Sequence, residues 1–151
     1  MKKFFIAMCM LVACTVVALA ATPAEESAGR IANLEKMLKS VPKATGVADL
    51  DSYVQASAAA GFLAVENSVL LKAATEGDLS VVVKLGDNIK KEQEALQEMT
   101  KLAPKAAESM KSLNPMKIGK AKKALDFANK CTEVVTAETT YQAQVVASLA
   151  K

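Results

Sequence analysis

Three glutamates fall at corresponding depths of the predicted helices and are candidates for one shared carboxylate site: Glu66, Glu92 and Glu138. Glu92 is the one polar residue in a row of positions that is otherwise apolar. If the helices pair as hairpins about Gly77 and Asn114, a rise of about 1.5 Å per residue brings the three carboxylates to one level. Carboxylates that converge in a core bind a hard cation or raise one another's pKa.

A second interpretation of these glutamates requires no shared site. Glu66 and Glu138 lie off the clearest apolar rows, so both would point to solvent, while Glu92 would hydrogen-bond to Thr139 or Gln142. Metal sites in helical bundles normally recruit histidine beside glutamate. We therefore predict no metal and no cofactor, and keep the shared carboxylate level as the alternative.

The sequence contains no histidine, and this absence excludes several kinds of active site. No Ser-His-Asp triad or Cys-His pair can form, and histidine-ligated haem and His-containing di-iron sites are excluded as well. A glycine-rich phosphate loop and a paired CxxC motif are also missing. The sequence therefore predicts a protein that is not an enzyme.

Lysines are concentrated in one part of the chain. Residues 101–130 contain 8 lysines and 2 acids, and four of these lysines crowd the start of the last predicted helix: Lys117, Lys120, Lys122 and Lys123. Such a cluster suits an anionic lipid head group, a polysaccharide or an acidic protein surface. The alternative is a solvated face that complements the acidic middle of the chain. Because aromatic residues are not interleaved with the lysines, single-stranded nucleic acid is not expected.

The first twenty residues have the three parts of a secretory signal. Lys2 and Lys3 form a basic start, an uncharged run over residues 4–19 follows, and Ala18-Leu19-Ala20 offers small residues to a signal peptidase. The uncharged run is shorter than the roughly 20 residues of a membrane-spanning helix. We predict a signal peptide over residues 1–20 and export of one domain, residues 21–151, to a bacterial periplasm or cell surface.

A lipoprotein is the alternative for the same segment. Leu11-Val12-Ala13-Cys14 resembles the lipobox, in which the cysteine becomes the lipidated first residue. The apolar stretch before Cys14 is short, and residues 15–21 are apolar where a lipoprotein usually has a polar tether. We therefore prefer cleavage after Ala20.

Removal of the signal changes both the charge and the thiols of the chain. Loss of Lys2 and Lys3 lowers the basic residues from 19 to 17 against 16 acids, so the net charge falls from +3 to about +1 and does not imply nucleic acid. Cys9 and Cys14 leave with the signal, so Cys131 has no internal disulfide partner. We predict that Cys131 is a small buried helix residue. An intermolecular bridge or a reactive thiol is the alternative.

The rest of the chain is rich in helix formers and is divided by three breaks. These breaks are Pro42 to Gly46, Gly77 with Asp78 as the next N-cap, and Asn114-Pro115. The resulting segments are 24–40, 49–76, 79–113 and 115–149. Since short connections make neighbouring helices antiparallel, the sequence predicts an all-α, antiparallel up-down bundle of about four helices preceded by an N-terminal signal peptide.

Two segments carry apolar rows in alternating steps of three and four. The third segment has Val82, Leu85, Ile89, Glu92, Leu96, Met99, Ala103, Ala106, Met110 and Leu113. The fourth has Ile118, Ala121, Leu125, Ala128, Thr132, Val135, Thr139, Gln142, Val146 and Leu149. Rows of this spacing are the seams by which helices of a bundle pack. Because the third row continues past Pro104, we predict a kink there, with a full break as the alternative.

The second segment differs because residues 54–74 carry only two charges, Glu66 and Lys72. A helix that is apolar nearly all round is buried on several sides or faces a partner. We predict self-association or a protein partner at residues 54–74. The alternative is that its alanines act as neutral surface and bind nothing.

These features together predict a non-enzymatic exported bundle with a binding or structural role in the bacterial envelope. An apolar-ligand carrier or a protein that lies peripherally on the membrane is the alternative function, because an apolar segment stands beside a basic one.

Overall fold

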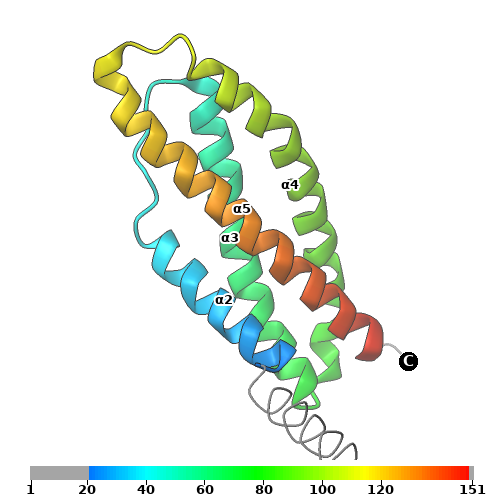
Figure 1. Cartoon of the computed structure of the whole chain (residues 1–151). Coiled ribbons are helices and arrows are strands. Elements are labelled where there is room, and N and C mark those ends of the chain that lie inside the picture. Colours follow the sequence, from blue (N-terminus) through cyan, green and yellow to red (C-terminus); the bar gives the residue numbers. More distant parts are fainter. Residues whose placement is uncertain (1–20, 150–151) are drawn as a thin grey trace, which may run out of the picture.

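The computed structural model describes residues 21–149, which form four α-helices packed against one another and no strand (Figure 1). The predicted all-helical bundle of four helices is confirmed to this extent. The predicted signal over residues 1–20 and the lipidation at Cys14 lie outside the described residues. The elements are α2 Pro23–Leu38, α3 Ala48–Thr75, the short 3-10 helix η1 Leu79–Val81, α4 Val82–Ser109 and α5 Pro115–Leu149.

The helix ends follow local signals in the sequence. Gly77 has φ +108°, a left-handed conformation that favours glycine, and it ends α3 where the sequence predicts. The Asn114 side chain accepts a hydrogen bond from the Met116 N–H at 3.0 Å and so caps α5 as predicted. At α2 the Thr22 hydroxyl accepts from the Glu25 N–H at 3.3 Å, and the Glu25 carboxylate accepts from the Thr22 N–H at 2.8 Å. This reciprocal capping box was not part of the sequence prediction.

α4 continues through Pro104 without interruption and ends at Ser109. The alternative of a full break at Pro104 is therefore wrong. The predicted segment 79–113 ends four residues later than α4. The helix stops earlier because a tight turn follows it, in which the Lys111 N–H donates to the Glu108 carbonyl at 3.0 Å.

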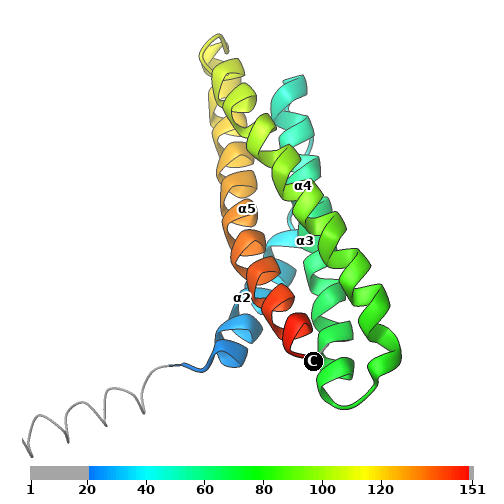
Figure 2. The ribbon, with the colours of Figure 1, turned by 90° about the vertical axis from the view of Figure 1, so that its right-hand side faces the viewer.

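α3 is the central helix, and α2, α4 and α5 all pack on it (Figure 2). Burial against three neighbours accounts for much of the apolar composition of residues 54–74, although Phe62 and Val69 stay exposed. By length and composition α3 also suffices to cross a membrane, with a mean hydropathy of 1.3 over its most apolar stretch. Core helices of soluble proteins meet the same test, and 44% of that stretch is buried inside the bundle, so this is weak evidence for a membrane span.

The predicted seams face the interior. Leu85 and Met99 of α4 and Val135 of α5 are fully buried, and Leu96 and Leu125 are partly buried against the cluster that contains Met99 and Val135. Burial of such side chains contributes about 1.5–3 kcal/mol each to folding. The core extends to α2 through Leu34, which is also fully buried. The apolar rows read from the sequence therefore identify the packing faces of α4 and α5.

Candidate functional site

A hollow of about 590 Å³ lies between the end of α2, the α2–α3 loop and the first half of α5. Two of the predicted lysines, Lys120 and Lys123, line this hollow. Lys43 from the loop and Lys130 from α5 line it as well, so four lysines line one space. We call this hollow, which the partly buried Phe127 also lines, the basic groove.

Helical spacing aligns the α5 residues of the basic groove. Residues 120, 123, 127 and 130 are separated by steps of three and four, which places them on one face of a helix. Lys43 reaches the same hollow from the α2–α3 loop. The Lys120 ammonium donates to the Ala44 carbonyl oxygen at 2.7 Å and thereby joins α5 to that loop.

Asp51 shapes the loop that carries Lys43. Its carboxylate accepts hydrogen bonds from the Thr45 N–H at 2.7 Å, the Thr45 hydroxyl at 2.7 Å and the Gly46 N–H at 3.0 Å. Burial raises the pKa of Asp51, but these hydrogen bonds and the charge of Lys120 outweigh burial and lower the pKa below its usual value. The carboxylate is therefore ionised at neutral pH, where it holds the loop in place.

The charges that line the basic groove are mostly of one sign. Asp126 is the only acid among the lining residues. Among the described residues, none of the four lysines of the groove forms an ion pair with a carboxylate. Four lysines beside one lining acid give a net positive potential that favours an anion, with part of the charge of Lys120 offset by Asp51.

The other two predicted lysines, Lys117 and Lys122, are exposed on α5 but do not line the groove. Their neighbour Met116, at the start of the same helix, is 92% exposed. The predicted cluster of four therefore divides into two lysines in the groove and two on the open surface near the α4–α5 turn. We call this exposed end of α5, which carries Met116, Lys117 and Lys122 on different sides of the helix, the basic tip.

The structure buries Glu138, contrary to the interpretation that it points to solvent. Its carboxylate is fully buried and accepts from the Ser27 hydroxyl at 2.6 Å, from Arg30 Nε at 2.9 Å and from Gln142 Nε2 at 3.2 Å. Arg30 also lies over the ring of Tyr141, 5.7 Å from its centroid. The reason for the burial is that α2 supplies both a counter-charge and a hydroxyl donor.

Glu92 is fully buried as well and lies close to Glu138. The pKa of Glu92 is raised to about 7, mainly by burial and also by the charge of Glu138, while the polar neighbours Asn67 and Thr139 oppose the shift. Asn67 Nδ2 donates to Glu92 Oε2 at 2.8 Å. The Thr139 hydroxyl donates to the Val135 carbonyl at 2.8 Å, and Gln142 Nε2 donates to the Ala64 carbonyl and to Glu138, so the predicted hydrogen bond of Glu92 to Thr139 or Gln142 is not seen among the described residues.

The predicted level of three glutamates is wrong in its third member. Glu66 is exposed and pairs with Lys84 at 3.0 Å on the surface of α3 and α4. Glu66 lies one residue before the buried Asn67, and successive residues of a helix face different directions. Only Glu92 and Glu138 therefore share the core.

Several buried polar atoms around Glu92 lack partners, and the acceptors outnumber the donors. Glu92 Oε1, Asn67 Oδ1 and Gln142 Oε1 are buried acceptors and Asn88 Nδ2 is a buried donor, and none of them has a hydrogen-bond partner among the described residues. Unmatched buried acceptors carry a cost in free energy. A protonated Glu92 carboxyl offers a donor in place of one acceptor, so the polar composition of the core supports the raised pKa.

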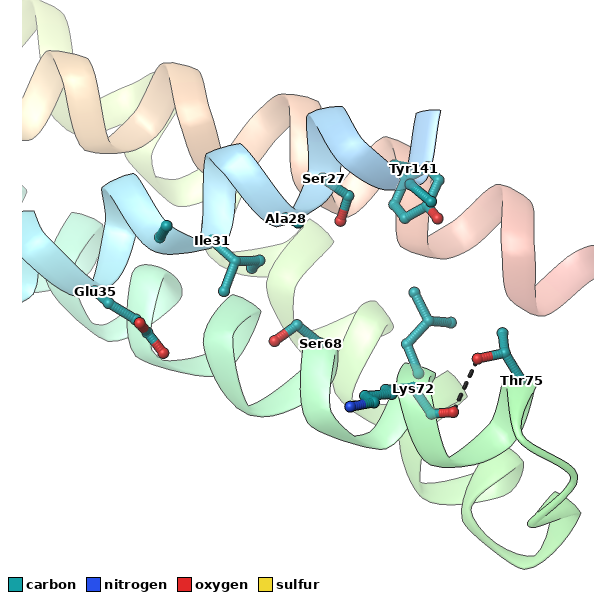
Figure 3. Close-up of a pocket in the computed structure, with 11 residues that line it drawn as sticks. Ser27, Ala28, Ile31, Glu35, Ser68, Lys72, Thr75 and Tyr141 are labelled. Atoms are coloured by element: carbon teal, nitrogen blue, oxygen red, sulfur yellow. Dashed lines mark hydrogen bonds between the residues drawn. The ribbon is translucent and has the colours of Figure 1, made fainter. Parts of the chain in front are cut away.

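A second hollow, of about 430 Å³, lies between α2, α3 and α5 (Figure 3). Ile31, Leu71 and Tyr141 are among its mainly apolar lining, and Ser68 adds a hydroxyl. Ser27 lines the same hollow and donates to the buried Glu138. We call this space the α2 pocket.

Cys131 is buried and free, as predicted for a small helix residue. Its thiol contacts the Ser57 carbonyl oxygen at 3.1 Å. Burial raises the pKa of Cys131 to about 11, so the thiolate is scarce at neutral pH.

Comparison of the chain with protein-family models, curated proteins and solved structures gives no match. Helical bundles host many unrelated functions, so the fold alone does not identify one. The function has to be argued from the basic groove, the basic tip and the α2 pocket.

Several residues of these sites were missed by sequence reasoning. Lys43 and Lys130 join Lys120 and Lys123 only through the fold, although the ten-residue step from 120 to 130 is visible on one helix face. Arg30 was missed too, and its signal was present: it is the only arginine of the chain. Arginine is favoured over lysine for pairing with buried carboxylates.

Proposed function

We propose that this protein is a non-enzymatic, exported helical bundle that binds an anionic component of the bacterial envelope. The observation that carries the proposal is the convergence of Lys43, Lys120, Lys123 and Lys130 on one hollow, beside the basic tip. Clustered lysines near an anionic surface contribute about 1 kcal/mol each to binding. Asp126 in the lining and Asp51 beside Lys120 offset only part of the charge of the four lysines.

The basic tip suits a peripheral contact with a membrane. Met116 exposes 92% of its surface beside Lys117, and an apolar side chain flanked by cations suits the boundary between head groups and acyl chains. An envelope location is supported by the secretory pattern of residues 1–20. The absence of histidine from the sequence supports a binding role over an enzymatic one.

An antiparallel up-down order of the helices is part of this proposal. Ser109 near the end of α4 donates to Asp49 near the start of α3 at 2.9 Å. Glu66, later in α3, pairs with Lys84 near the start of α4 at 3.0 Å. Early α3 thus meets late α4, and later α3 meets early α4, which supports antiparallel packing of this pair.

Co-sedimentation of the purified protein with vesicles tests the proposal. We expect binding to vesicles of phosphatidylglycerol and phosphatidylcholine at low salt, weakened at 0.5 M NaCl because salt screens surface charges. The variant Lys117→Gln/Lys122→Gln should bind more weakly than the matched Lys90→Gln/Lys91→Gln, which removes two exposed lysines of α4. Equal loss in both variants, or no binding to anionic vesicles, contradicts the proposal.

A carrier of small apolar ligands is the second candidate function, and the α2 pocket favours it. A volume of about 430 Å³ lies within the range of roughly 300–1,000 Å³ typical of ligand pockets.

Self-association through residues 54–74 stays a prediction, supported now only by the exposed Phe62 and Val69 of α3. Light scattering of the purified protein at high concentration tests it, and a strict monomer contradicts it.

A further inference from the structure

We propose that the basic groove binds one small anionic amphiphile, a molecule with a phosphate-monoester head joined to an apolar group. This inference rests on the proposed function and names the ligand class of one of its two surfaces. The basic tip meets an extended anionic surface, whereas the groove is an open hollow of about 590 Å³ with room for one small molecule.

The charge of the groove indicates a head with more than one negative charge. Four lysines and Asp126 line it, so its net charge is +3. A carboxylate carries one charge, while a phosphate monoester carries about −1.5 to −2 and offers three strong acceptor oxygens. Lysine ammonium groups donate in three directions and bind phosphate as point charges.

The positions of the lysines indicate where the head lies. Lys43 comes from the α2–α3 loop, and Lys120 is held beside that loop by its 2.7 Å hydrogen bond to the Ala44 carbonyl. Lys123 lies one helical turn further along α5. These three cations border one end of the groove, so the phosphate is expected there. Lys130 lies about 15 Å from Lys120 along the helix, at a rise of about 1.5 Å per residue.

The apolar residues of the groove indicate that the ligand is an amphiphile. Phe127 and Met37 line the space and are only partly buried, with their inner surfaces packed against the main core. Pro42 adds a further apolar wall. Phe127 lies between the levels of Lys123 and Lys130, so an apolar group extending from the head would cover it. Covering apolar surface contributes to affinity in proportion to its area.

Isothermal titration of the purified protein with dihexanoyl phosphatidic acid below its micelle concentration tests the site. We expect saturable binding of one molecule, weakened about twenty-five-fold in Lys43→Ala/Lys123→Ala, at about fivefold for each lysine removed. The matched Lys90→Ala/Lys91→Ala removes the same charge from an exposed part of α4 outside the groove and should leave this affinity unchanged. Circular dichroism checks that both variants are folded.

Asp126→Asn provides a test with the opposite sign. Removal of the only acid lining the groove should strengthen binding of the phosphatidic acid several-fold, an effect that general destabilisation does not produce. Unchanged or weaker binding in this variant overturns the placement of the head within the groove.

Two further probes separate the possible results. If inorganic phosphate binds as tightly as dihexanoyl phosphatidic acid, the apolar part of the proposed ligand is wrong. If neither binds saturably while the protein still sediments with anionic vesicles, the groove site is overturned and the proposed function stands. If the protein binds neither the soluble probes nor the vesicles, both fail.

Discussion

Arg30 of α2 donates through Nε to the fully buried Oε2 of Glu138 on α5 at a distance of 2.9 Å. This ion pair, together with the Ser27 hydroxyl on the other carboxylate oxygen, is the polar attachment of α2 to the bundle. Arg30 retains 23% exposure of its side chain, while Glu138 has none. The stability of α2 against the bundle therefore depends on a carboxylate that has no access to water.

Glu138→Gln should destabilise the protein because it leaves the partly buried Arg30 without its counter-charge. Breaking a buried pair costs roughly 3–5 kcal/mol, and the partial exposure of Arg30 lowers our expectation to about 2 kcal/mol. Urea unfolding at pH 7 followed by circular dichroism measures the loss. The matched Glu26→Gln, whose carboxylate is 59% exposed and 3.8 Å from Arg30, should cost less than about 0.5 kcal/mol.

The position of Arg30 gives a second readout of the same variant. Because the chain has one arginine, an arginine-specific protease has one site. Loosening of α2 in Glu138→Gln should speed cleavage after Arg30 relative to both Glu26→Gln and the native protein. Equal cleavage rates in all three proteins would show that the ion pair does not hold α2.

Glu92 should make stability fall as the pH rises from 5 to 8. Its pKa is raised to about 7 in the folded protein against 4.5 in the unfolded chain, so folding favours the protonated form. The stabilisation by protonated Glu92 is complete below pH 4.5 and is lost progressively as the pH rises to about 7. Above that pH, the stability of the protein no longer changes through Glu92. A shift of this size corresponds to at most about 3 kcal/mol.

Urea unfolding at pH 5.5 and pH 8 tests this sign, with Glu92→Gln as the control. The chain has no histidine to titrate between these values, so the glutamine variant should lose most of the pH dependence. A native protein that is more stable at pH 8 than at pH 5.5 would contradict the raised pKa.

The sequence predicts the fold well because its information is local and periodic. The stop at Gly77, the cap at Asn114 and the apolar rows of α4 and α5 each depend on spacing within one segment. The end of α4 at Ser109 was missed by four residues because a tight turn, visible only in the fold, replaces the last helical turn.

The sites were predicted less completely because they depend on contacts between segments. The sequence places Glu92 in the interior from its row, but it assigns Glu138 to either of two environments. Hydrogen bonds from Ser27 and Arg30, which lie more than 100 residues earlier in the chain, hold Glu138 in the buried environment. Lys43 likewise joins Lys120 only after the α2–α3 loop folds beside α5.

Gly61→Ala and Gly86→Ala should differ in their effects on stability, although both replace a glycine within a helix. Alanine gains about 1 kcal/mol of helix propensity over glycine. A Cβ at Gly86 meets nothing within 4 Å, so this variant should be more stable than the native protein. A Cβ at Gly61 lies 3.1 Å from Cys131 Sγ and 3.2 Å from Leu38 Cδ2, so crowding should cancel the gain.

Thermal unfolding of the two glycine variants measures the difference. Adding Cys131→Ala removes the sulfur atom that crowds residue 61, so it should cost less in the Gly61→Ala background than in the native protein. Equal stabilisation by both single variants would contradict the close approach of α3 to α5 and α2.

The α2 pocket should bind a neutral apolar probe, and filling the pocket should prevent this. Nile red is uncharged, so its binding reports on apolar space and not on the basic groove. Ala28 lines the pocket, and Ala28→Phe places an aromatic ring in a space of about 430 Å³. We expect Nile red fluorescence to fall several-fold in this variant. Ala107→Phe, at an exposed position of α4 outside the pocket, should leave it unchanged. Equal fluorescence in both variants would remove the apolar-ligand function from consideration.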